Sequence, residues 1–183
     1  MITATPTKIP DVVLVQPQVF QDHRGYFMET YKQQEFVDNG LPTHFLQENQ
    51  SGSKKGTLRG IHYQIRHAQG KLVRVLSGEI FDIAVDLRRS SPTFGQWVGA
   101  ILSAENKHQL WVPAGFGHGF LTLSDRAEIF YKATDIYAPE WERTILWNDP
   151  ELAIDWPVTD DCPLTLSDKD LRGKLFADAE IYD

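Results

Sequence analysis

The residue types best suited to chemistry are a histidine that can exchange protons and two arginines that can bind phosphate. His62 closes the run Leu-Arg-Gly-Ile-His, and a neutral imidazole titrates near working pH, as a general base must. Arg24 and Arg59 each precede a glycine, which lets a ligand approach the backbone, and a guanidinium binds phosphate oxygens in pairs. Taken alone, His62 is better explained as a structural histidine, and a surface turn after Asp22 is the alternative for Arg24. The residue types are nevertheless those that a general base and a phosphate-binding site require.

A second histidine, His118, lies in the stretch Pro-Ala-Gly-Phe-Gly-His. The spacing Pro-x-Gly-x-x-His is similar to the second motif of cupin jelly rolls, in which a turn delivers a histidine into the barrel. Metal-binding cupins also need a His-x-His pair and a glutamate, whereas this chain has His62-Tyr63-Gln64. We therefore expect no metal, and a metal-dependent cupin oxygenase is disfavoured. The alternative for His118 is a structural histidine at the barrel mouth.

The elements that must position these residues are predicted to be short strands. Turn signals recur at a spacing typical of a sandwich or barrel, so we expect an all-β jelly-roll (cupin-like) barrel with a few short helices. The predicted helices are 32–39, which ends before Gly40, and a short one after Ser167, where acidic residues follow a capping serine. The predicted strands are 12–15, 26–31, 45–51, 57–64, 72–76, 80–87, 97–102, 109–112, 119–123, 128–133 and 144–147.

The chain has 183 residues, of which 42% are apolar, which is the length of one domain with a sizeable core. We expect a single domain over 1–183, with the jelly-roll core at roughly 12–147. The tail beyond this core contains Trp156 and Leu166, so we expect it to pack on the barrel.

Charge and cysteine content narrow the possible partners and the compartment. The formal net charge is -7, which argues against a nucleic-acid or membrane-surface role, because such partners require basic surfaces. Cys162 is the single cysteine, as is typical of a reducing compartment. Because the first ten residues lack a secretory signal and no apolar stretch approaches ~18 residues, we expect a cytoplasmic protein.

A longer set of motifs, taken in order, covers nearly the whole chain and resembles the dTDP-4-dehydrorhamnose 3,5-epimerase family. Each run is weak alone, but the ordered set at compatible spacing is highly specific. The motifs are Phe20-x-Asp22-x-Arg24-Gly25-x-Phe27, Gln47-x-Asn49-x-Ser51, Leu58-Arg59-Gly60-Ile61-His62-x-Gln64, Gln69-Gly70-Lys71, Asp82-x-x-x-Asp86-Leu87-Arg88, Ser91-Pro92-Thr93-Phe94-Gly95, His118-Gly119-Phe120, Tyr131-Lys132, Asp155-Trp156-Pro157 and Leu166-Ser167-x-Lys169-Asp170.

The resemblance implies cofactor-independent epimerisation of dTDP-4-dehydro-6-deoxy-D-glucose to dTDP-4-dehydro-L-rhamnose, in dTDP-L-rhamnose biosynthesis. It makes His62 the base, Tyr131 the proton donor, Asp170 the carboxylate that orients His62, and Lys71 the cation that stabilises the enolate. Structural alternatives are a core aromatic for Tyr131, a helix N-cap carboxylate for Asp170 and a solvated strand-start lysine for Lys71.

The resemblance also implies a set of substrate-binding residues, and it implies neither metal nor cofactor. Two positions depart from the family pattern: Gly117 replaces an alanine, and Ile136 replaces an aromatic residue before Tyr137. Thymine stacking is therefore expected from Tyr137, or from Phe20 and Phe27. The implied binding residues are Arg24, Glu29, Gln47, Asn49, Arg59, Lys71, His118, Tyr137, Glu142 and Lys169.

The resemblance further implies a homodimer in which a segment within 20–29 reaches the partner's site. Competing interpretations within catalysis are an enzyme that epimerises one carbon and a ketoisomerase, and Tyr131 favours the double epimerase over the ketoisomerase. A non-catalytic cupin that binds a nucleotide-sugar is the alternative from another class, and it predicts that His62, Tyr131 and Asp170 are dispensable.

Overall fold

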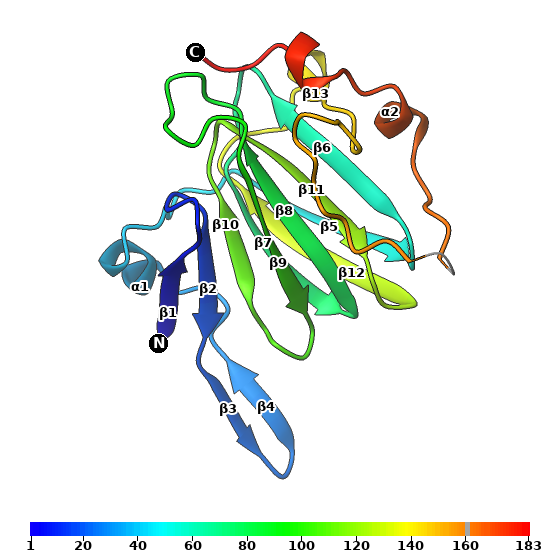
Figure 1. Ribbon diagram of the computed structural model, residues 1–183. Helices are drawn as coiled ribbons and strands as arrows, with labels where there is room; N and C mark the ends of the chain where they lie inside the picture. Colours follow the sequence, from blue (N-terminus) through cyan, green and yellow to red (C-terminus); the bar gives the residue numbers. More distant parts are fainter. Residues whose placement is uncertain (160–161) are drawn as a thin grey trace.

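The computed structural model describes residues 1–159 and 162–183, and most of this backbone is β-strand (Figure 1). None of the helices in these ranges is long and apolar enough to cross a membrane. The helices are α1 (Gln33–Asp38), α2 (Asp168–Leu171) and the 3-10 turns η1 (Pro139–Trp141) and η2 (Phe176–Asp178). The strands are β1 (Ile2–Pro6), β2 (Val13–Pro17), β3 (Val19–Asp22), β4 (Gly25–Met28), β5 (Gln47–Lys54), β6 (Leu58–Gln64), β7 (Lys71–Ser77), β8 (Glu79–Asp86), β9 (Trp97–Ser103), β10 (Gln109–Val112), β11 (Phe116–Thr122), β12 (Arg126–Ala133) and β13 (Glu142–Thr144).

The long strands form two antiparallel sheets. One has the order β1-β2-β10-β7-β12-β5 and the other the order β13-β6-β11-β8-β9. Buried residues of both sheets form one apolar cluster between them, which is the arrangement of a jelly roll. The prediction of an all-β, cupin-like jelly-roll barrel is therefore confirmed. The β3–β4 hairpin pairs with neither sheet and projects beyond the end of the barrel (Figure 1).

Alternation along the strands divides the barrel interior into an apolar end and a polar end. On β12, Ile129 is fully buried in the core cluster, whereas Tyr131, on the same face, lines a cavity. On β7, Val73 and Val75 belong to that core cluster, and Lys71 lines the same cavity. Because side chains two residues apart share a face, each strand supplies both packing and a polar group to the interior.

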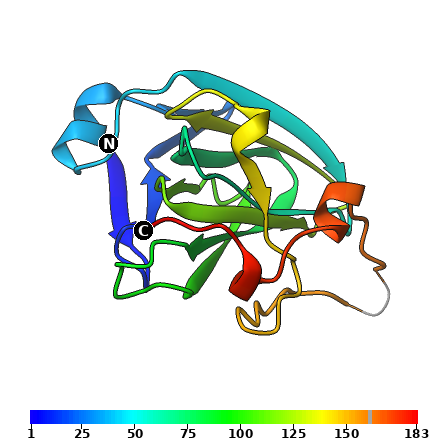
Figure 2. The ribbon, with the colours of Figure 1, turned by 90° about the horizontal axis from the view of Figure 1, so that it is seen from above.

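The outward face of the five-stranded sheet is covered by the C-terminal segment, drawn in orange to red along one side of the molecule in Figure 2. Ile61 and Tyr63 of β6 form a second apolar cluster with Trp156 and Phe176. The Trp156 indole Nε1 donates to the Trp147 carbonyl at 2.8 Å. These contacts stabilise the strand that carries His62 from behind.

The motif Asp86-Leu87-Arg88 followed by Ser91 and Thr93 has a structural explanation at the end of β8. The fully buried Asp86 carboxylate accepts from Arg88 Nε at 2.9 Å, from Ser91 Oγ at 2.5 Å and from Thr93 Oγ1 at 2.7 Å. Burial opposes ionisation of Asp86, but these hydrogen bonds outweigh it and lower its pKa to about 2. This network fixes the loop before β9.

Several predicted element boundaries were wrong. Strands β1 and β3 were not predicted, because β1 is an edge strand ending in proline and the hairpin exposes its apolar residues, so neither shows a burial pattern. The strand predicted at 26–31 ends at Met28. The strand predicted at 144–147 is instead β13, which ends at Thr144, after which Ile145 bridges to Lys174. The two predicted helices are present. Helix α1 is shorter than the predicted 32–39, and α2 is a short helix directly after Ser167, as expected.

We expect the tail to unfold together with the barrel, since Trp156 is 8% exposed within the second cluster. Trp156→Ala should lower the free energy of unfolding by about 3–5 kcal/mol, as is typical for removal of a buried tryptophan. Val158→Ala, at a position that is 45% exposed, should change it by less than ~0.5 kcal/mol. Urea denaturation followed by fluorescence and circular dichroism measures both. Separate transitions for the two probes in the unsubstituted protein would show that the tail is an independent unit.

Candidate active site

A cavity of about 340 Å³ opens at the polar end of the barrel. It brings together ten of the residues predicted to act in catalysis or binding, and three that were not predicted: Ser51, Gln69 and Phe120. The ten are Gln47, Asn49, Arg59, His62, Lys71, His118, Tyr131, Tyr137, Glu142 and Lys169.

The cavity walls come from opposite sheets. Strands β5, β7 and β12 of the six-stranded sheet supply one wall, which includes Lys71 and Tyr131. Strands β13, β6 and β11 of the five-stranded sheet supply the other, which includes His62 and His118. The imidazole of His62 and the phenol of Tyr131 therefore line the same cavity from different sheets.

His62 is paired with Asp170, which lies behind it and does not line the cavity. The His62 Nε2 and Asp170 Oδ1 atoms are 2.7 Å apart, and Asp170 is 2% exposed. The same Oδ1 accepts from the Gly60 backbone N–H at 3.2 Å. Burial opposes ionisation of Asp170, but hydrogen bonds from His62 and Ser167 outweigh it and hold its pKa below the ordinary range.

The ionised Asp170 determines which imidazole nitrogen is free. Because a carboxylate only accepts hydrogen bonds, His62 Nε2 carries the hydrogen and Nδ1 is left to accept a proton. Burial lowers the pKa of His62; the Asp170 hydrogen bond opposes this, and the positive charges of Lys169 and Lys71 add to it. His62 is therefore neutral near pH 7, the state that a general base requires.

Close packing of the β6 backbone against β11 fixes the strand next to His62. Gly60 has a φ of +125°, and a Cβ there would lie 2.5 Å from the Gly119 Cα on β11. Only glycine fits this approach, which brings the Gly60 N–H toward Asp170. His62 is directly opposite His118 in the register of the two strands.

Lys71 is a partly buried cation in the cavity. Burial lowers its pKa to about 8, the negative charges of Asp82 and Glu142 oppose that shift, and Lys169 adds to it. A lysine in this environment is protonated at neutral pH and only partly solvated. It can therefore stabilise negative charge that develops on a ligand oxygen.

Asp82 is a polar residue of this site to which we assigned no role from the sequence. It is fully buried on β8, and its Oδ1 lies 2.8 Å from His118 Nε2. Its Oδ2 has no hydrogen-bond partner among the described residues. The signal was an acidic residue at an inward position of the apolar run 80–87, where a charge is costly unless it is paired.

Tyr131 and the cavity rim complete the electrostatics. Burial raises the pKa of Tyr131, with Arg59 opposing, so the phenol keeps its proton at neutral pH. At the rim, Glu142 Oε1 accepts from Lys169 Nζ at 2.8 Å and Glu142 Oε2 from the Tyr137 hydroxyl at 3.1 Å. The Tyr137 N–H donates to Gln47 Oε1 at 2.8 Å. These bonds tie three separate segments together around the opening.

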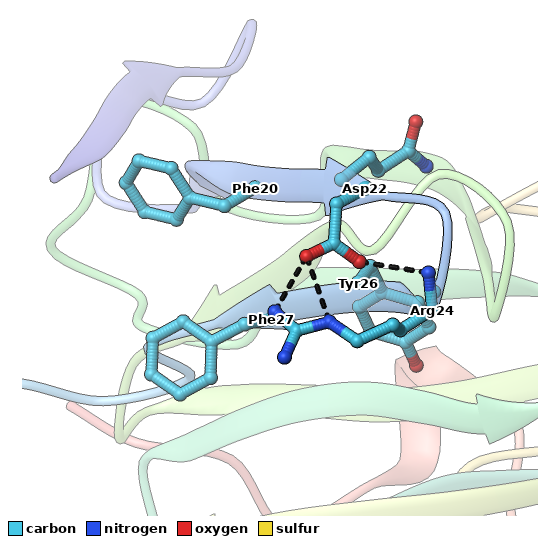
Figure 3. Close-up of a pocket in the computed structure, with 7 residues that line it drawn as sticks. Phe20, Asp22, Arg24, Tyr26 and Phe27 are labelled. Atoms are coloured by element: carbon cyan, nitrogen blue, oxygen red, sulfur yellow. Dashed lines mark hydrogen bonds and ion pairs between the residues drawn. The ribbon is translucent and has the colours of Figure 1, made fainter.

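Arg24 and Glu29 lie outside the cavity. Arg24 is at the tip of the β3–β4 hairpin, where its guanidinium pairs with Asp22 at 2.6 Å and its side chain is 79% exposed (Figure 3). Glu29 follows the hairpin, with its carboxylate 3.7 Å from Lys32 Nζ. Phe20 and Phe27 lie side by side on the same hairpin (Figure 3) and are 51% and 66% exposed.

No group of three or more His, Cys, Asp or Glu side chains positioned to hold a metal ion occurs in 1–159 or 162–183. The polar groups that meet in the cavity are instead suited to proton transfer and to anion binding.

Comparison with known proteins identifies relatives over the full described length. A family model described as dTDP-4-dehydrorhamnose 3,5-epimerase matches residues 6–178. A protein of that name from Pseudomonas aeruginosa is 62% identical over 180 residues, which cover 98% of each chain. A crystal structure from Legionella pneumophila, named a dTDP-6-deoxy-D-glucose-3,5-epimerase and holding dTDP-4-keto-L-rhamnose, has a TM-score of 0.94 and 48% identity, covering 98% of this chain and 95% of that one.

A solved structure with a narrower activity is also similar. A 3'-monoepimerase from Streptomyces bikiniensis, in complex with dTDP-quinovose, has a TM-score of 0.87 and 36% identity to this chain. The match covers 94% of this chain and 87% of that one. The same fold therefore accommodates epimerisation at one carbon.

The pairing of His62 with Asp170 predicts a distinctive titration. In protein labelled with 15N-histidine, we expect His62 to carry its hydrogen on Nε2 and to titrate below the ordinary value of 6.5, because burial lowers its pKa. Asp170→Asn should lower this pKa further, since it removes the negative charge that favours imidazolium. Asp168→Asn, which changes a carboxylate that is 90% exposed, serves as the control and should leave it unchanged. A His62 resonance that is insensitive to Asp170→Asn would contradict the pairing.

Proposed function

The chain belongs to the dTDP-4-dehydrorhamnose 3,5-epimerase family, and from this premise we propose that it converts dTDP-4-dehydro-6-deoxy-D-glucose into dTDP-4-dehydro-L-rhamnose, in dTDP-L-rhamnose biosynthesis. The observation that carries the proposal is the geometry of the cavity. A neutral, carboxylate-paired imidazole and a protonated phenol stand on opposite walls, and a partly buried lysine lines the same space.

The reaction begins with removal of a proton next to the sugar ketone. The carbonyl at carbon 4 acidifies the protons on carbons 3 and 5, so no redox cofactor or metal is required. His62 takes the proton on Nδ1, and Asp170 stabilises the imidazolium that forms. The C–H electron pair forms a double bond to carbon 4, and the carbonyl π electrons move to oxygen 4. This gives an enolate with its negative charge on oxygen 4.

Lys71 stabilises this enolate. Its ammonium is partly screened from bulk water in the cavity, where an electrostatic interaction is stronger than in solvent. With a pKa of about 8, Lys71 is mostly protonated at neutral pH. The negative charge of the bound enolate favours the protonated form further.

Tyr131 then returns a proton to the opposite face of the same carbon, which inverts the configuration. This role is supported by the position of Tyr131 on β12 of the other sheet and by the proton that its phenol keeps at neutral pH. His62 then releases its proton to solvent and Tyr131 regains one from solvent, after which repetition at the second carbon gives the double epimer. A 3-monoepimerase is the second candidate, favoured by the likeness to the Streptomyces bikiniensis enzyme.

The diphosphate and thymine are assigned to residues at and around the rim. Arg59, whose Nε lies 3.1 Å from Ser53 Oγ, supplies guanidinium hydrogen bonds to phosphate. Tyr137 is 50% exposed at the opening, and we assign it to stacking on thymine. The other proposed binding residues of the cavity are Gln47, Asn49, His118, Glu142 and Lys169.

We include a homodimer in the proposal, because the β3–β4 hairpin leaves its apolar side chains exposed in a single chain. Phe20 and Phe27 expose large apolar surfaces, and such surfaces mark interaction sites. Arg24 lies on the same hairpin. We propose that the hairpin enters the partner's site, where Arg24 binds the diphosphate and the two phenylalanines contact the nucleotide. Glu29 contributes to binding from the same segment. The single cysteine favours a cytoplasmic location for this dimer.

Replacement of the proposed base tests the activity. His62→Ala should lower kcat by about 10²–10⁴-fold, the usual contribution of a general base. Incubation in deuterated water, followed by NMR of the sugar, should show deuterium at both carbons with the unsubstituted enzyme. His67→Ala, on a side chain that is 51% exposed outside the cavity, is the matched control and should keep full activity.

Deuterium at one carbon alone would show that the protein is a monoepimerase and not a double epimerase. Turnover by His62→Ala near the unsubstituted rate, in protein that is still folded, would exclude His62 as the base. Binding of the nucleotide-sugar with no exchange at either carbon would favour a non-catalytic cupin.

Mixed dimers test the contribution of the hairpin. Arg24→Ala and His62→Ala should each be strongly impaired as homodimers. A dimer of one subunit of each kind contains one site with both residues intact if Arg24 acts on the partner's site, and none if Arg24 acts within its own chain. Coexpression with two affinity tags isolates the mixed dimer, and about half of the unsubstituted kcat per dimer should return, because a two-fold dimer has two equivalent sites. No recovery would place Arg24 in its own subunit's site.

A further inference from the structure

Helix α2 begins with a capping box that involves the partner of His62. Ser167 is the N-cap residue, and its Oγ accepts from the Asp170 N–H at 3.3 Å. In return, Asp170 Oδ2 accepts from the Ser167 N–H at 3.2 Å and from the Ser167 hydroxyl at 2.5 Å. A capping box usually serves only to satisfy the first turn of a helix, but α2 has just four residues.

The two oxygens of Asp170 have separate tasks. Oδ1 accepts from His62 and from the Gly60 N–H, while Oδ2 accepts only from Ser167 among the described residues. The carboxylate is 2% exposed, so no bulk water replaces a lost donor. Rotation of the carboxylate about its axis would break contacts to β6 and to Ser167 at once. Its orientation is therefore fixed from both sides.

We propose that Ser167 is a positioning residue for the epimerisation, because its hydroxyl holds the Asp170 carboxylate in the orientation that pairs with His62. This inference rests on the proposed function. Ser167 does not line the cavity, so it acts through Asp170 and not on the substrate. The same Ser167–Asp170 hydrogen bonds therefore cap α2 and align the base.

The electrostatic consequence has a definite direction. The charged groups that act on His62 are Asp170 and Lys169 of α2, Lys71 of β7 and Glu142 of β13. Among them, Ser167 bonds only to Asp170. Without the Ser167 hydroxyl, the Asp170 carboxylate loses the orientation that pairs it with His62, which weakens the attraction between Asp170 and imidazolium. The pKa of His62 should then fall, in the same direction as with Asp170→Asn.

Ser167→Ala tests the inference, with Ser124→Ala as the matched control. Ser124 also caps a turn, since its Oγ accepts from the Glu79 N–H at 2.8 Å and donates to the Arg126 carbonyl at 2.7 Å, but it lies outside the cavity. Ser167→Ala should lower kcat by about 10-fold, as loss of an outer hydrogen-bond partner commonly does, with little change in KM. The acidic limb of its kcat/KM profile should move to lower pH, because weaker pairing with Asp170 lowers the pKa of His62, and the alkaline limb should stay in place. Ser167→Thr keeps the hydroxyl and should restore both properties.

The outcomes separate this inference from the proposed function. If Ser167→Ala lowers the melting temperature as Ser124→Ala does but leaves the acidic limb and the His62 NMR titration unchanged, Ser167 is only a helix cap and the inference is wrong. If the unsubstituted protein shows no epimerisation, the proposed function fails, and the proposed positioning of His62 is still decided by the NMR titration of Ser167→Ala. Should Ser167→Ala not fold, Ser167→Gly removes the same hydroxyl with a residue that N-cap positions accept.

Discussion

The central constraint on this structure is a buried carboxylate that stays ionised. A charge removed from water is costly unless donors surround it, and Asp170 has four of them, from Gly60, His62 and Ser167. These donors belong to β6 and to the start of α2, which are more than a hundred residues apart in the chain. Satisfying one carboxylate thus ties the C-terminal segment to the barrel and at the same time fixes the imidazole of His62.

The barrel provides the second condition, which is a polar cavity inside an apolar fold. Strand alternation lets β7 and β12 place valine and isoleucine in the core while Lys71 and Tyr131 lie on the same faces further along. The apolar end supplies stability and the polar end supplies chemistry. Because the two walls come from strands of different sheets, His62 and Tyr131 line one cavity without a flexible loop to bring them together.

The hairpin has the opposite character, since its phenylalanines and Arg24 are exposed. Tyr26 contacts Lys107, but Phe20 and Phe27 face only each other across the hairpin and stay largely exposed, so burial of their apolar surface requires a partner. The cavity rim, with Tyr137 half exposed, is similarly open. An exposed apolar arm and an open polar site within one chain are complementary features, and a two-fold assembly would satisfy both.

The sequence alone established the strand-rich class and the two helices, because alternation and capping signals are encoded along the chain. His62 has the residue type of a general base, but the roles of Lys71 and Tyr131 and most of the other cavity residues came from the resemblance to the epimerase family. The sequence did not distinguish Asp170 from Asp168 by local pattern, since both suit the first turn of a helix. It assigned no role to Asp82, and to Ser167 it assigned only that of a helix cap. Only the tertiary structure decided these points, because the burial of a carboxylate and the identity of its donors depend on contacts between distant segments. Asp170 proved to cap its helix with one oxygen and to pair with His62 through the other, so the two interpretations that the sequence left as alternatives both hold.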